Sequence, residues 1–105
     1  MIVTTTNSIE GKQIEQYLGL VSGEVILGTN VVRDFLASIT DIIGGRSGTY
    51  ESKLAEGRDM AVEEMVKKAR NMGANAVIGV DLDFETLRDG MMMCIATGTA
   101  VKVKE

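Results

Sequence analysis

The chain has 105 residues, with 11 basic and 15 acidic side chains, a formal net charge of −4, and no dense run of either sign. An acidic chain with two Tyr, two Phe and no Trp lacks the positive surface and the stacking platform that nucleic acids require, and its charge disfavours an anionic membrane surface. Histidine is absent and Cys94 is the only cysteine, which removes the commonest general base and any Cys/His zinc cluster. The length fits a single domain over residues 1–105. Because these catalytic groups are absent, we expect that the protein is not an enzyme.

The N-terminal segment lacks the features of a targeting sequence. Residues 1–6 have neither the basic start nor the long apolar run of a signal peptide, and no apolar stretch approaches membrane-spanning length. A single cysteine cannot form a disulfide within one subunit, which suits a reducing compartment. These features predict a cytoplasmic protein.

The first part of the chain predicts two strands. A short one spans Ile2–Thr6, and a longer one spans Gln13–Leu27, where both alternating faces are largely apolar. Such a strand is expected to be covered on both sides. Gly19 and Gly23 within it predict a bulge, or a helix that lies close against the missing side chains.

Two amphipathic helices are expected next. The first begins at the N-cap Asn30 and keeps an apolar face through Ile43; the second spans Thr49–Met72, with Gly73 as its left-handed cap. The second would be about 36 Å long, whereas a compact domain of this size has a radius of gyration of about 13 Å. Part of it should therefore extend beyond its own core and pack on a neighbouring subunit, which predicts a homo-oligomer.

The last third predicts a β-hairpin. Residues 76–87 and 91–103 are strand-like, and Asp89-Gly90 between them is typical of a two-residue turn. That turn would pair Phe84 with Ile95 on the core face and Glu85 with Cys94 on the second face. The expected element order is therefore β-β-α-α-β-β in an α+β fold.

Four residues of this hairpin are candidate ligands of a divalent metal ion: Asp81, Asp83, Glu85 and Cys94. Carboxylates at alternate strand positions suit a hard cation, whereas a thiolate favours a soft one, so the set selects neither. Ligands along a flat strand also need help from another chain to surround an ion. The alternative is a solvated sheet face that charge keeps soluble.

The glycine-rich joint between the two predicted helices is a second candidate site, for a small anion. Its residues are Gly45, Arg46, Ser47 and Gly48. Backbone N–H groups at a helix start and the guanidinium could together hold negative charge. The alternative is a helix-to-helix turn in which Arg46 pairs with an acidic residue at a subunit contact.

Several segments together resemble one family, the YbjQ-like family of small bacterial proteins. They are Leu20–Gly28, Arg33–Phe35, Asp41–Glu51, Gly73–Glu85 and Gly98–Val101. The resemblance covers nearly the whole chain. It implies a dodecin-like α+β subunit, in which a curved, mainly antiparallel sheet packs on helices, and assembly into a ring, a homopentamer. The family has a heavy-metal-binding label but no established function. Asp81, Asp83 and Glu85 are carried over only as matching positions.

Two functional hypotheses follow. The first is a ring-forming cytoplasmic protein that binds a metal ion or small anion at sites shared between subunits. The second is a structural or interaction protein that docks a protein partner without a small ligand.

Overall fold

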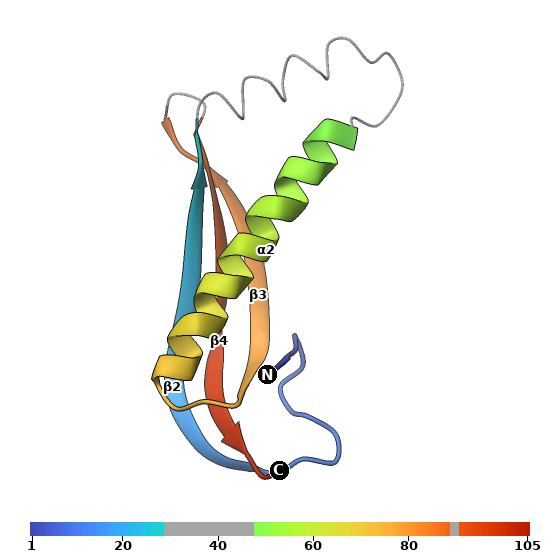
Figure 1. Cartoon of the computed structure of the whole chain (residues 1–105), viewed down its shortest axis with the longest axis vertical. Coiled ribbons are helices and arrows are strands. Elements are labelled where there is room, and N and C mark those ends of the chain that lie inside the picture. The colour runs from blue at the N-terminus through green and yellow to red at the C-terminus, as the bar shows by residue number, and fades with distance from the viewer. Residues whose placement is uncertain (29–47, 89–90) are drawn as a thin grey trace.

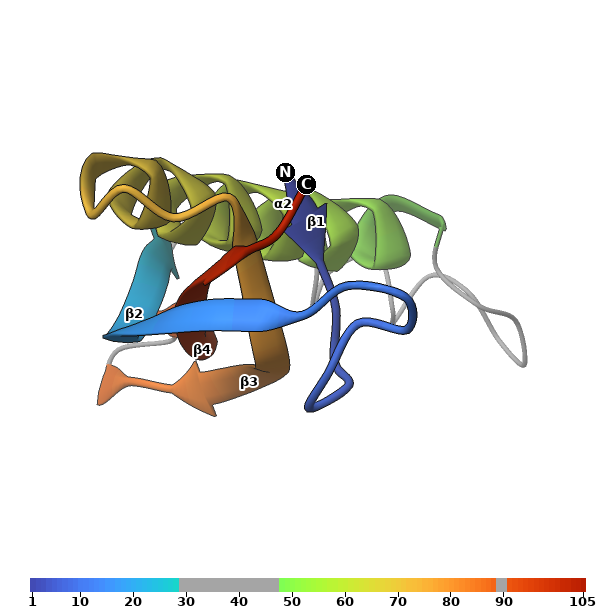
Figure 2. The same cartoon turned by 90° about the horizontal axis from the view of Figure 1, so that it is seen from below.

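The computed structural model describes residues 1–28, 48–88 and 91–105 and contains four strands and one helix in the order β-β-α-β-β. The strands are β1 (Ile2–Val3), β2 (Ile14–Leu27), β3 (Ala76–Thr86) and β4 (Met92–Val103), and the helix is α2 (Gly48–Asn71). The strands form one sheet in the order β1-β3-β4-β2. Figure 1 shows α2 crossing one face of this sheet diagonally, and Figure 2 shows the helix and the sheet as two layers.

The predicted order with two helices is wrong for the described chain, which has one helix and a mixed sheet. Residues 30–43, where the first helix was expected, lie outside the described residues. The N-terminal strand has two residues and pairs parallel with the start of β3, while β2 and β3 pair antiparallel with β4. The structure is that of one chain, so self-association stays a prediction.

Contact between α2 and the sheet depends on small residues. A Cβ atom placed on Gly23 would lie 2.0 Å from the carbonyl oxygen of Ala61 and 2.5 Å from the backbone nitrogen of Met65. Ala61 and Met65, together with Ala69 one turn further on, are fully buried. The helix can therefore approach β2 only because Gly23 has no side chain, which confirms the close approach predicted at this position.

Gly19 marks an irregularity in β2. Its φ of 122° lies in the region that favours glycine, and the register with β4 shifts between Tyr17 and Gly19. The shift turns Leu18 toward the core beneath α2 and leaves Tyr17 68% exposed on the other side. The bulge predicted at this strand is confirmed.

The side of the sheet away from α2, which we call the outer face, is covered at one end by other residues of the described ranges. There Ala76, Ile78, Val101 and Val103 form a small cluster with Ile9 and Ile14 of the N-terminal region. Further along β2, Leu20 is 87% exposed and Ile26 is 54% exposed. The prediction that β2 is covered on both sides is therefore wrong within one described subunit.

Helix α2 extends past the sheet at its N-terminal end, as both views show (Figures 1 and 2). Its C-terminal half, by contrast, supplies the buried residues Ala61, Met65 and Ala69. Gly73 follows with a φ of 91° and ends the helix as predicted. Within the described ranges, no helix has both the length and the apolar character needed to cross a membrane.

The hairpin of β3 and β4 forms, but next to its connection, over residues 81–86 of β3, the register differs by one residue from the prediction. Leu87 donates its backbone N–H to the carbonyl of Met91 at 2.6 Å, which leaves three connecting residues instead of two. Phe84 therefore pairs with Cys94, and Glu85 pairs with Met93. The expected two-residue turn itself, at residues 89–90, lies outside the described residues. Because alternate strand residues face opposite sides, this difference moves Cys94 to the other face.

Candidate functional site

The predicted carboxylate row lies on the outer face of β3. Asp81, Asp83 and Glu85 pair with Thr97, Ile95 and Met93 of β4 and are all exposed. The pKa of Asp83 is raised. The largest cause is a hydrogen bond with Asp81, the next is repulsion by the charge of Asp81, and the charge of Glu85 has a smaller effect. The three carboxylates thus share the outer face of β3.

Cys94 does not belong to this row. It is fully buried beneath α2, opposite Phe84 on one side and Val25 on the other. Burial raises the pKa of its thiol, an effect that the positive charge of Arg58 partly offsets. The prediction that Cys94 shares a face with the carboxylates is wrong, because the hairpin register places it in the core.

These positions decide which metal ions the row suits. In the described part of the chain, no three His, Cys, Asp or Glu side chains are grouped closely enough to hold an ion. The only thiol is buried on the opposite face, so the row has oxygen donors alone. Such a donor set suits a hard divalent cation and does not fit a soft heavy metal that prefers thiolate.

Most of the predicted anion site cannot be compared with the structure. Gly45, Arg46 and Ser47 lie outside the described residues, and Gly48 is the first residue of α2. Gly48 is consistent with the expected helix start within one residue. Anion binding at this joint stays a prediction.

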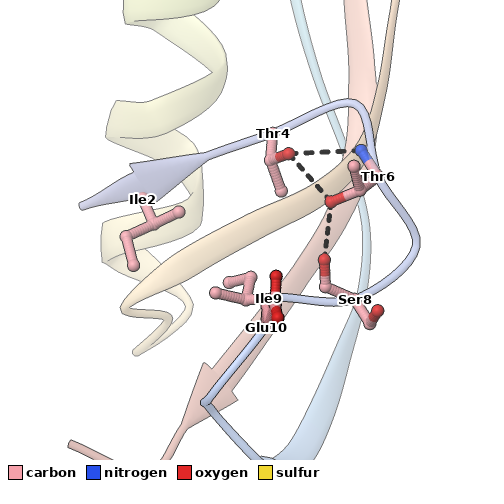
Figure 3. A pocket seen from close by; sticks show the side chains of 6 residues that line it. All are labelled: Ile2, Thr4, Thr6, Ser8, Ile9 and Glu10. Atoms are coloured by element: carbon pink, nitrogen blue, oxygen red, sulfur yellow. Dashed lines mark hydrogen bonds between the residues drawn. The ribbon is translucent and has the colours of Figure 1, made fainter.

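A hollow that the sequence reading missed lies beside β1, with a volume of about 360 Å³. Figure 3 shows its lining, to which Ile2, Thr4, Thr6, Ser8, Ile9 and Glu10 contribute. The Thr4 and Thr6 hydroxyl oxygens are 2.9 Å apart, and the Thr6 hydroxyl donates to the Ser8 carbonyl at 2.5 Å. The Thr6 N–H also donates to the Thr4 hydroxyl oxygen at 3.2 Å. These hydrogen bonds all join residues of the same loop, so the Thr4 and Thr6 hydroxyls stabilise the conformation of the loop.

A second hollow that the sequence reading missed lies between β2 and α2 and has a volume of about 260 Å³. We call it the acidic groove; its lining residues are Glu24, Val25, Met60, Glu63, Glu64 and Lys67. Glu63, Glu64 and Lys67 fall within one turn of α2, which brings their charges together beside the strand. No local pattern reveals this groove, because it forms only where the helix lies against the middle of β2.

Comparisons with known proteins agree over the whole chain. A family model, YbjQ_1, described as "Putative heavy-metal-binding", matches residues 1–104. A UPF0145 protein of Anoxybacillus flavithermus is 96% identical over 105 residues and the full length of both chains. One from Halalkalibacterium halodurans is 66% identical over 104 residues, covering 99% of this chain and 97% of the other.

One solved structure gives independent support for the fold. A protein of unknown function from Pediococcus pentosaceus, assigned to the DUF74 family, matches with a TM-score of 0.56. The match covers 99% of this chain and 98% of the other at 16% sequence identity, so it speaks for the fold alone. The match of residues 1–104 to the family model and the identity to UPF0145 proteins show that this chain belongs to the YbjQ family.

Proposed function

We propose that the protein is an interaction module that self-associates through the outer face of its sheet. One observation carries the proposal: Tyr17, Leu20 and Ile26, all on the outer face of β2, are 68%, 87% and 54% exposed. Large apolar side chains gathered on one strand face are typical of a surface that another protein covers. A second copy presents the same face, so the contact is self-complementary.

The size of the effect can be estimated. Burying one fully exposed leucine contributes about 1.5–3 kcal/mol, which corresponds to about a 10- to 150-fold change in affinity. Leu20 is almost fully exposed in the single subunit, so most of this free energy is available to an interface. A self-complementary contact of this kind closes at two subunits, whereas the homopentamer implied by the family resemblance would need the outer face to meet a different surface of its neighbour.

Sedimentation velocity and native mass spectrometry of purified protein test the proposal. We expect the wild-type protein to have a mass well above the 11.3 kDa of one chain. Leu20→Lys should shift it toward single chains, because the charge would be buried at the contact. Met60→Lys is the matched control, since Met60 is 48% exposed on α2, away from the outer face. Wild-type protein that sediments as a single chain at tens of micromolar would refute self-association.

A second candidate function is binding of a hard divalent cation by Asp81, Asp83 and Glu85 from more than one copy. The repulsion that raises the pKa of Asp83 favours it, because a cation would relieve that repulsion. The description of the family as heavy-metal-binding also points to metals, although a heavy metal fits these oxygen donors poorly. Native mass spectrometry before and after chelator treatment should then show a fixed number of ions per assembly, lost in Asp83→Ala but kept in Glu10→Ala. Protein without chelator-removable mass would contradict this candidate.

A further inference from the structure

The long free edge of β2 is the feature that the proposed self-association leaves unused. β2 has 14 residues, lies at the end of the sheet and pairs only with β4. Beyond the strand ladder, the backbone hydrogen bonds found in the described ranges include none from residues 14–27. Proteins commonly protect such an edge with lysine or other charged residues, proline or a bulge; this segment has no Lys, Arg or Pro, and its protection is limited to Glu15, Glu24 and the bulge at Gly19. As far as the described residues go, the edge is therefore open to pairing with another extended chain.

Hollows on both sides of the sheet flank the same part of this edge. The acidic groove lies on the α2 side, with Val25 and the half-exposed Met60 as its apolar part. On the outer face, a hollow of about 280 Å³ is lined by Leu20, Val21, Ser22 and Thr97. Alternate side chains of a strand point to opposite faces, so a strand added here would place its residues in the two hollows by turns.

Charge identifies the kind of strand that fits. Glu63 and Glu64 bring two carboxylates to the acidic groove against the single ammonium group of Lys67, while the Glu24 side chain belongs to the outer face with Leu20 and Ile26. The other unpaired sheet edge among the described residues, along residues 81–86 of β3, carries Asp81, Asp83 and Glu85 on the outer face. Neither β2 nor β3 of a second copy has a basic side chain to offer the acidic groove, so a basic strand of another protein is the better occupant of this edge.

We propose that the β2 edge binds an extended, basic segment of a partner protein by strand addition, with basic side chains in the acidic groove and uncharged ones on the outer face. The backbone groups of β2 would supply affinity, and Glu63 and Glu64 would supply the preference for positive charge. This inference rests on the proposed role as an interaction module and names the chemistry of its partner.

The test uses an eight-residue peptide of alternating Lys and Val with blocked ends, titrated into the isotopically labelled full chain. Two peptides serve as controls: one of alternating Glu and Val, and one in which a central Val of the basic peptide is replaced by Pro. We expect the basic peptide to protect backbone amides in residues 20–25 from hydrogen exchange and neither control to do so. The double variant Glu63→Gln/Glu64→Gln should weaken binding about three- to tenfold, because groove-rim charges have small individual effects. Asp83→Asn, at the other acidic edge, should bind unchanged.

Four results would overturn the inference. They are no binding, equal binding of the proline peptide, protection of residues 81–86 in place of residues 20–25, and β2 amides already protected by a second copy before peptide is added. Sedimentation of the same sample without peptide separates this inference from the proposed function. Protein that self-associates but ignores the peptide would refute strand addition alone, whereas single chains that bind the peptide would refute self-association alone.

Discussion

Gly23→Ala is the substitution that most directly tests how α2 packs on the sheet. The added Cβ would lie 2.0 Å from the Ala61 carbonyl oxygen, and ordinary contact begins at 3.4 Å, so the helix must move by about 1.4 Å at this point. The atoms that it meets belong to the helix backbone, which cannot rotate away as a side chain can. A gap of about 1 Å already forfeits up to about half of the dispersion energy of the contacts it separates. Met65 and Ala61, both fully buried, lose contacts of this kind.

We expect Gly23→Ala to lower the free energy of unfolding by about 3 kcal/mol or more, at the upper end of overpacking effects. Urea unfolding followed by circular dichroism measures it. Gly57→Ala is the matched control: its Cβ would meet only the flexible Leu27 side chain at 3.4 Å, and alanine favours the helix by about 1 kcal/mol. It should leave stability unchanged or raise it. A Gly23→Ala protein within 1 kcal/mol of wild type would refute the close helix–strand contact.

Three further predictions concern hydrogen bonding, charge and the buried thiol. Asn75 donates to the Val103 carbonyl at 2.9 Å and accepts from the Val103 N–H at 2.7 Å, so Asn75→Ala should destabilise by about 1–3 kcal/mol in urea unfolding; an unchanged midpoint would contradict this. Asp81 raises the pKa of Asp83 in the folded protein, so the contribution of Asp83 to stability is greatest below its pKa in the unfolded chain and is lost as the pH rises through its pKa in the folded protein. Melting temperatures measured from pH 3 to 7 should therefore show the wild-type protein losing stability relative to Asp83→Asn. Parallel curves for the two proteins would exclude the repulsion. In the folded protein, the Cys94 thiol should react with a disulfide reagent at least about 100-fold more slowly than in protein unfolded by urea. The structure around Cys94 must first open locally, at a free-energy cost of about 3 kcal/mol. Equal rates would show that the thiol is accessible in the folded protein.

Local patterns predicted the long elements well because these elements follow from short-range preferences. The alternating apolar residues of β2, the helical period of α2 and the left-handed cap at Gly73 each act within a few residues. Gly19 and Gly23 were also informative, since a glycine inside a strand pattern implies a bulge or a close approach, and the structure shows one of each.

The candidate site was less predictable because it depends on a single residue of register. The sequence placed Cys94 beside Glu85, yet the three-residue connection closed by Leu87 and Met91 pairs it with Phe84 and buries it. Both registers give plausible faces in the sequence, so packing under α2 had to decide between them. The prediction that the three carboxylates lie on one face did not depend on the register. Asp81, Asp83 and Glu85 alternate along one strand, so they share a face whatever residues they pair with.

The sequence by itself determined which segments are extended or helical, that the chain is acidic and lacks histidine, and which family it resembles. Only the tertiary structure decided that the N-terminal strand pairs parallel with β3, that an apolar cluster covers one end of the outer face, and that an acidic groove lies between β2 and α2. Each of these properties joins residues far apart in the chain. Such contacts are fixed by burial and by backbone pairing between distant segments, which no local pattern records.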